Sequence, residues 1–265
     1  MGRGNLRRDP VNPAFWQIDQ ETPFGYASGA VEGVSTVHKF GKNPVLSNSE
    51  AAIWSAGGQY NFLDQAQPVF VISGGNAADA SAGAGARTVT VLGLGADWGS
   101  AEETLTLNGG TQSSVTTTQF TRVFRAFVAQ AGTYGGVNTG AISIAGTVAS
   151  GVVGHILAAA GQSQLAIYTV PSGHTGYLTR IDVNVAGTKA ANVRMYQRQR
   201  ANVVAGDFGS QRVVWDYADL TGDASGAFES YPSFPQMTDI WIAGEKTSAG
   251  TAATSAVFNI ILKKG

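Results

Sequence analysis

The chain lacks cysteine altogether, so no disulfide framework can staple it and no thiolate can act as a nucleophile or metal ligand. It also has little charge: 13% of its 265 residues are Asp, Glu, Lys or Arg, and the formal net charge is −1. Soluble domains contain about 25% charged residues, so we expect part of this surface to be covered by other protein. The near-neutral balance argues against nucleic acid and against a charged membrane surface as partners.

Long apolar runs are missing too. No stretch approaches the roughly 18 residues of a membrane helix, and "MGRGNLRRDP" has no apolar segment after its arginines, so we expect neither a signal peptide nor a membrane partner. Histidine is scarce: His38, His155 and His174 lie far apart and show no metal-ligand spacing. The sequence therefore predicts no metal site and no cofactor, although a structural ion in a loop is left open.

Residues 1–48 differ in composition from the rest of the chain. They hold Pro10, Pro13, Pro23 and Pro44, half of the chain's 8 prolines, and scattered aromatic residues without helical or strand periodicity. Such a segment cannot bury a core of its own, so we predict an extended N-terminal arm. Its predicted partner-binding residues are Phe15, Trp16, Phe24 and Tyr26. The arm is expected to contact either another subunit or the chain's own domain.

The remaining sequence is typical of an all-β protein. Short runs rich in β-branched and aromatic residues are separated by Gly, Asn and Ser at regular spacing. Strands are predicted at 67–73, 86–94, 103–109, 119–129, 140–146, 163–171, 175–187, 191–200, 211–218, 237–245 and 255–264. We predict two β-sandwich, jelly-roll-like halves, at 49–150 and 151–265, although the small apolar residues near 150 also allow a continuous strand there.

Two local features accompany this pattern. A short helix is predicted within "SNSEAAIWSAGG" (47–58), capped by Ser47 or Asn48 and ended by Gly57 and Gly58. "VPSGHTG" (170–176) is predicted to be a hairpin turn between two strands.

The glycine-rich stretch "SAGAGARTVTV" (81–91) is the one place where a nucleotide loop can be considered. A phosphate-binding loop needs Lys and Ser or Thr after its last glycine, but Arg87 and Thr88 follow Ala86 here. A dinucleotide loop needs a third glycine and a helix, whereas Thr88 takes that place and the next residues favour a strand. Without a helix N-terminus, there are no free backbone N–H groups arranged to bind a phosphate. We therefore predict a loose connection between strands.

Two groups of arginines lie within predicted strands. Arg194, Tyr196, Arg198 and Arg200 share parity in "VRMYQRQR", so a strand places all four on one face. This face is predicted to bind a partner protein; the alternatives are a solvated face balanced by cross-strand acids such as Asp216 or Asp182, a glycan or nucleic acid.

The second group stands in "TRVFRAFV". Arg122 and Arg125 each lie among apolar neighbours there. A partly buried arginine needs an acidic partner, which predicts a salt bridge between sheets or subunits. Glu102 and Glu103 are adjacent, so on a strand they point to opposite faces and do not form an acid–base pair.

Several motifs occur in order along residues 31–265: "VHKFGKNP", "AAIWSAGGQY", "GARTVTVLGLGADW", "EETLTLNG", "RVFRAFV", "GGVNTGAISI", "YTVPSGHTGYL" and "MTDIWI". In these motifs the chain resembles a family of virion structural proteins of tailed phages, particularly marine and cyanobacterial ones. The resemblance implies a particle component without catalytic residues. It does not extend over the first 30 residues.

From these features we expect a non-enzymatic virion protein that decorates or cements a capsid. Its expected partners are the major capsid protein or other virion proteins, with homo-oligomers, including a trimer, as a plausible arrangement. A tail fibre, collar or adaptor is the first alternative. A host-glycan-binding module, using Trp98, Tyr134 or the Arg194–Arg200 face, is the second, and a polysaccharide depolymerase is the last.

Overall fold

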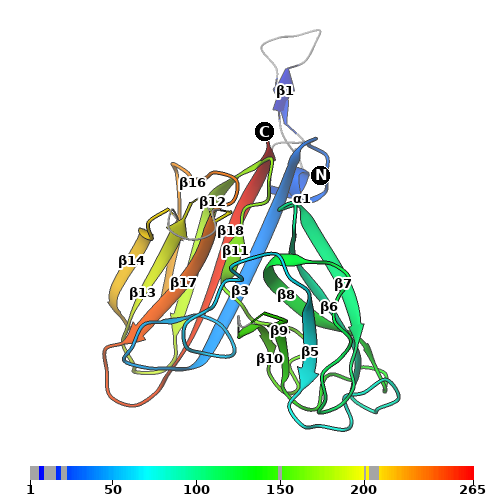
Figure 1. Ribbon diagram of the computed structural model, residues 1–265. Helices are drawn as coiled ribbons and strands as arrows, with labels where there is room; N and C mark the ends of the chain where they lie inside the picture. The colour runs from blue at the N-terminus through cyan, green and yellow to red at the C-terminus, as the bar shows by residue number, and fades with distance from the viewer. Residues whose placement is uncertain (1–5, 9–15, 19–22, 149–150, 200, 203–208) are drawn as a thin grey trace.

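The computed structural model describes residues 6–8, 16–18, 23–148, 151–199, 201–202 and 209–265, and the side chains of residues 6–8, 16–18, 23 and 24 fall outside this description. Within these residues the fold is all-β, as the sequence predicts, and the single helix is the short α1 (Pro23–Ala27). The strands form two lobes that lie side by side in Figure 1. In the described part of the chain, no helix is long and apolar enough to cross a membrane.

The second lobe is built from two sheets around one core. One sheet has the order β11-β17-β13-β14 with β4 beside β17, and the other has the order β15-β12-β18-β3 with β16 beside β12. Their bounds are β3 (Val34–Leu46), β4 (Ala51–Ala52), β11 (Ile167–Thr169), β12 (His174–Val185), β13 (Ala191–Arg198), β14 (Arg212–Leu220), β15 (Gly222–Ala227), β16 (Ser233–Phe234), β17 (Asp239–Lys246) and β18 (Ala252–Lys264). Alternate residues of both sheets, such as Phe258, Ile181 and Met195, meet in a shared apolar cluster.

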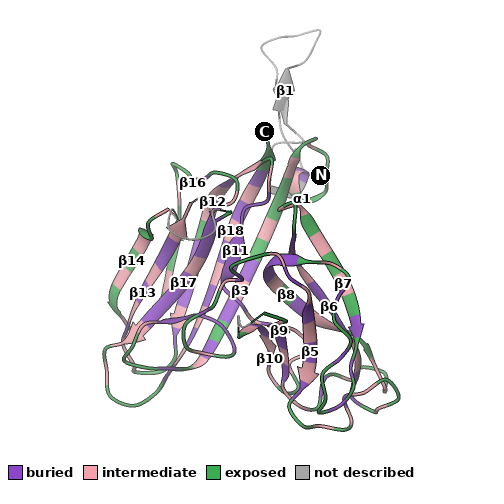
Figure 2. Ribbon diagram, in the orientation of Figure 1, coloured by how far each residue is buried: buried purple, intermediate pink, exposed green. Residues whose placement is uncertain are grey.

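The first lobe is smaller and holds a separate core. Its sheets have the orders β10-β9-β5 and β7-β6-β8. The bounds are β5 (Val69–Ser73), β6 (Ala86–Gly95), β7 (Ser100–Thr106), β8 (Phe120–Ala131), β9 (Ile142–Gly146) and β10 (Val152–Ile156). Side chains from both sheets, among them Val71, Val91 and Phe120, form its apolar cluster. Figure 2 shows these inward faces as buried and much of β7 and β14 as exposed.

The path of the chain differs from the predicted segments in two places. β3 pairs with β18 over a register from Ala252↔Leu46 to Lys263↔Val34, so residues 34–46 form a strand and the extended arm does not include them. β10 pairs with β9, so the strand that begins at Val152 lies in the first lobe instead of the half expected at 151–265. The first lobe is thus inserted between β4 and β11 of the second.

Three finer expectations also need correction. The jelly-roll-like description is not confirmed, because the first lobe has two three-stranded sheets where a jelly roll has about eight strands in two Greek keys. The predicted helix at 47–58 is absent, and the short strand β4 lies there. The turn before β12 does not join a hairpin, since β11 pairs with β17 and β12 with β18. It carries the chain from one sheet to the other, with Gly173 at φ 71°.

The glycine-rich connection between β5 and β6 is compact and anchored, not loose. The carboxylate of Asp79 is fully buried and accepts hydrogen bonds from the backbone N–H groups of Ala86 (2.8 Å), Thr139 (2.8 Å) and Gly140 (2.7 Å). A Cβ at Gly85 would lie 2.3 Å from an Asp79 carboxylate oxygen, so a glycine is required for the chain to pass this close. Burial raises the pKa of Asp79, but these backbone donors outweigh it and hold the pKa below its usual value.

The N-terminal strands β1 (Leu6–Arg8) and β2 (Trp16–Ile18) form a two-stranded antiparallel sheet of their own. Among the described strands they pair with each other and with no strand of either lobe. Figure 1 shows β1 beyond the end of the lobes, past the ends of β3 and β18. This sheet therefore extends the molecule at the end where the C-terminus lies.

Candidate functional site

The junction between the lobes centres on an ion pair inside the protein. Arg122 on β8 of the first lobe faces Asp239, the first residue of β17 in the second lobe. Their relative exposures are 4% and 0%. Arg122 Nε lies 2.8 Å from Asp239 Oδ1, and Arg122 Nη2 lies 3.1 Å from Oδ2. The salt bridge predicted for Arg122 is confirmed and joins two sheets of one chain.

The remaining lone pairs of the Asp239 carboxylate are also used. Thr169 Oγ1 donates to Oδ1 at 2.7 Å, and Arg198 Nη2 donates to Oδ2 at 2.7 Å. Burial alone would raise the pKa of Asp239, but the charges and hydrogen bonds of Arg122 and Arg198 outweigh burial and lower the pKa. Each oxygen thus accepts two hydrogen bonds within the fold. This arrangement joins strands of both lobes, and both carboxylate oxygens of Asp239 are used in hydrogen bonds within the protein.

Aromatic rings pack around this ion pair and form more of the contact between the lobes. The Arg122 guanidinium lies 4.9 Å from the ring centroid of Trp98 and 5.3 Å from that of Phe62, and such cation–π contacts add stabilisation to a desolvated arginine. The Phe62 ring packs edge-on against Tyr60 and Trp241. Trp98, a candidate glycan platform, is therefore half-buried and engaged by Arg122.

A second feature of the junction is an open cleft of about 540 Å³ between β3 and the β7-β6-β8 sheet. Lys39 on β3 lines this cleft, and its buried ammonium group donates a hydrogen bond to the carbonyl oxygen of Phe124. Burial, and to a smaller extent repulsion from Arg125, lowers the pKa of Lys39 to about 7. Glu102 and Tyr168 line the same cleft. The cleft therefore combines cationic, acidic and aromatic groups from both lobes.

The adjacent carboxylates diverge as predicted. Glu103 accepts hydrogen bonds from the N–H groups of Thr118 (2.7 Å) and Thr117 (2.9 Å), while Glu102 lines the cleft. For Arg125 the predicted ion pair is wrong, because its guanidinium is exposed and bonds the side chain of Gln162 at 3.1 Å.

The described arginines of the predicted face of β13 form ion pairs with acidic residues of the same chain. Arg194 contacts Asp216 at 3.1 Å and Glu50 at 3.2 Å, and Tyr196 donates to the Glu50 carboxylate at 2.6 Å. Arg198 is held by Asp239. Asp216 is thus the cross-strand acid that the sequence suggested, whereas Asp182 pairs with Arg180. Arg200 lies outside the described residues, and a partner for this face stays a prediction.

The predicted partner-binding residues of the arm are only partly described. Phe15 lies outside the described residues, and Trp16 and Phe24 are placed by backbone alone in β2 and α1. Tyr26, at the end of α1, is half-buried. Their role in binding stays a prediction.

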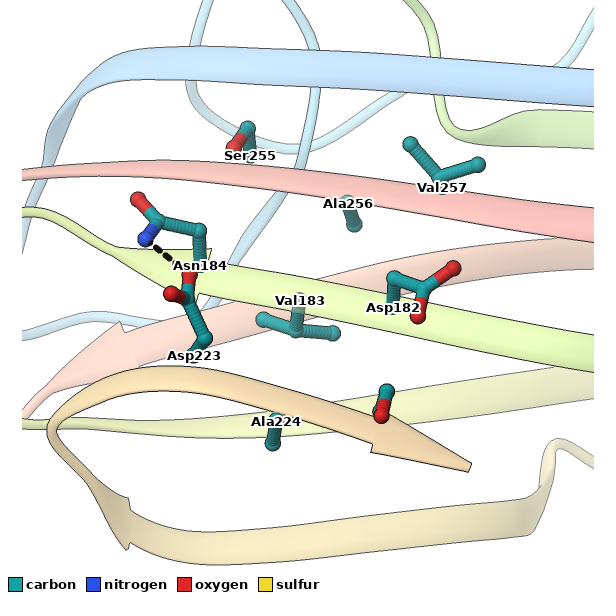
Figure 3. Close-up of a pocket in the computed structure, with 9 residues that line it drawn as sticks. Asp182, Val183, Asn184, Asp223, Ala224, Ser255, Ala256 and Val257 are labelled. Carbon is teal, nitrogen blue, oxygen red and sulfur yellow. Dashed lines mark hydrogen bonds between the residues drawn. The ribbon is translucent and has the colours of Figure 1, made fainter. Parts of the chain in front are cut away.

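A second hollow, of about 360 Å³, lies over the outward face of β15, β12 and β18. Figure 3 shows Asp182, Asn184 and Asp223 around it, with the Asn184 amide donating to the Asp223 carboxylate. Asp182 is engaged by a bidentate contact from Arg180 at 2.7 and 2.9 Å. No group of three His, Cys, Asp or Glu that could hold a metal ion occurs among the described residues.

Sequence reasoning found Arg122 but missed its partner and the cleft. Asp239 stands in "MTDIWI", an acid flanked by apolar residues in a predicted strand, and this is the signal that could have identified a buried counter-charge. The sequence places Lys39 in the predicted arm, where its burial beside Phe124 is not expected.

Comparisons with known proteins give little further guidance. No family model matches the chain, and no curated protein matches it. Similar solved structures include those of infectious bursal disease virus, the Gt strain at 10% identity over 88% of this chain and 73% of that chain with a TM-score of 0.25, and the Gx strain at 11% over 86% and 75% with 0.23. The VP2 subviral particle of that virus follows at 11% over 88% and 77%, with a TM-score of 0.19. Scores this low do not show a shared fold.

Proposed function

We propose that this chain is a non-enzymatic structural protein of a virion, and that it cements or decorates the capsid by binding neighbouring subunits. The observation that carries the proposal is the N-terminal hairpin: β1 and β2 form a sheet outside both lobes. An isolated two-stranded hairpin is marginally stable in water, so it gains free energy by docking on another surface.

The organisation of the lobes supports the same role. The buried Arg122–Asp239 pair, with Arg198 and Thr169, fixes two separately cored lobes to each other. A protein that bridges capsid subunits needs such a fixed body and a segment that reaches a neighbour. The order of motifs that resembles phage virion proteins agrees with this assignment, and a tail component is the alternative.

Deleting residues 1–30 is expected to leave a folded, soluble protein that no longer enters particles. The deletion removes the hairpin and α1 but leaves β3 and both cores in place. Aromatic residues such as Trp16 are expected to supply much of the lost binding free energy, because buried aromatics dominate interfaces. Incorporation is measured by mass spectrometry of purified particles assembled with the truncated or the full chain.

A full-length variant with Tyr134→Ala provides the control, since this side chain is fully exposed on the first lobe and its loss should leave incorporation unchanged. Particles that take up the truncated chain at the level of the full chain would show that the arm does not attach the protein.

A further inference from the structure

Two cations of the inter-lobe cleft have no acidic partner in the described part of the chain. The Lys39 ammonium hydrogen-bonds the carbonyl oxygen of Phe124 and lies 5.5 Å from the centroid of the Phe124 ring. Arg125, the next residue of β8, hydrogen-bonds the neutral side chain of Gln162. The ion pairs among the described residues all belong to other arginines. A buried charge without a counter-charge is costly, so this part of the molecule favours an added anion.

The cleft gives an anion access to this charge. Its volume of about 540 Å³ falls in the range of roughly 300–1,000 Å³ that is usual for small-molecule sites. Lys39 is 7% exposed, whereas Arg125 on the facing strand is open to solvent. Repulsion from Arg125 contributes to the lowered pKa of Lys39, so the two groups lie within electrostatic range. An anion that contacts Arg125 therefore also stabilises the charged form of Lys39.

The rest of the lining indicates what the anion is attached to. Leu92, Phe124 and Tyr168 give the cleft apolar walls. In the β7-β6-β8 sheet, Leu92 pairs with Glu102 on one side and with Arg125 on the other. The acid and the cation are thus two strands apart, about 9–10 Å, a distance at which salt screens much of the effect of an exposed charge. Leu92 lies between them as an apolar platform.

We propose that the inter-lobe cleft binds a small organic anion, a carboxylate carried on an aromatic or aliphatic body, which contacts Arg125 and neutralises the charge of Lys39. The two unpaired cations select a carboxylate over a neutral or cationic group, and the apolar walls select its body. This inference goes beyond the proposed virion role. It is tested on the isolated full chain, so its failure leaves that role untouched.

The first test is calorimetric titration of the full chain with 2-naphthoate at pH 6.5, compared with the neutral 2-naphthamide. We expect saturable binding of the carboxylate and about tenfold weaker binding of the amide, because hydrogen bonds to charged groups are the stronger ones. Arg125→Gln is expected to weaken the binding of naphthoate by about tenfold. Arg212→Gln, at an exposed arginine of β14 outside the cleft, is the control and should leave the affinity unchanged.

A second readout follows the proton of Lys39. Its pKa is about 7 in the free protein, so its amine is mostly neutral at pH 8, and a nearby anion raises the pKa. Binding at pH 8 is therefore expected to take up roughly half to one proton per ligand, measured in two buffers that differ in ionisation enthalpy. Lys39→Met should abolish this uptake. The variant keeps Glu102 and His38, which also line the cleft, so it separates the lysine from them.

Four results would each overturn the proposal. They are no binding at millimolar naphthoate, equal binding of the amide, an affinity that Arg125→Gln leaves unchanged, and binding at pH 8 without an uptake of protons that depends on Lys39. The last would show that the anion binds away from the buried cation.

Discussion

Replacing Asp239 by Asn is expected to lower the free energy of unfolding by about 3–5 kcal/mol, the cost of leaving a buried charge without its partner. The substitution keeps the volume of the side chain and removes the negative charge that faces Arg122, which is 4% exposed, and Arg198. Denaturant unfolding at neutral pH measures the effect. The pKa of Asp239 lies below its usual value, so its contribution is present at neutral pH and is lost as the pH falls through that lowered pKa.

Asp182→Asn is the matched control, since it removes the same group from an exposed arginine pair. The side chains of Arg180 and Asp182 are 56% and 32% exposed, and exposed pairs contribute roughly 0–1 kcal/mol. If Asp239→Asn costs no more than Asp182→Asn, the buried pair does not hold the lobes together.

Lys39→Met is expected to stabilise the protein at pH 6–7 by about 2–4 kcal/mol, and to lose much of this advantage by pH 10. The pKa of Lys39 is about 7 in the folded chain and 10.5 without the fold. Between these values the unfolded chain binds a proton that the folded chain does not, so the stability of the natural protein rises with pH across this window. Below pH 7 both states carry the charge, and the full cost of burying it is present.

Chemical denaturation of the natural protein and of Lys39→Met at several pH values between 6 and 10 measures the difference in their free energies of unfolding. Lys42→Met, at an exposed lysine of the same strand, controls for the loss of a lysine side chain. A difference between natural and Lys39→Met proteins that does not change with pH would show that Lys39 does not titrate inside the cleft.

Strand composition predicts the all-β class and many of the strands, because local alternation reports which face of a strand is buried. "EETLTL" is an example: Leu105 and Leu107 are buried while Thr104 and Thr106 are exposed, as the period of two requires. The sequence does not predict β3, because its apolar residues are interrupted by Lys39, Gly41 and Asn43. Those residues fit a strand only through partners distant in sequence, such as β18 and Phe124.

Only one feature of the candidate site could be predicted from the sequence, namely that a buried arginine needs an acidic partner. Arg122 among phenylalanines implied a buried acid, but Asp239 lies 117 positions away and no local pattern selects it. The prediction that a strand follows the glycine cluster is confirmed, because β6 begins at Ala86. The anchoring of the cluster by Asp79 depends on Thr139 and Gly140, which only the tertiary fold brings near. Contacts between residues that are distant in sequence therefore cannot be predicted from local sequence patterns.

The most direct test of the proposed virion role is quantitative mass spectrometry of purified, nuclease-treated virus particles from a culture that produces this chain, which counts its copies per particle. Attachment to the capsid shell predicts hundreds of copies per particle, and a dozen or fewer would move the protein to the tail. Abundant chain in infected cells with none in particles would contradict a structural role in the virion.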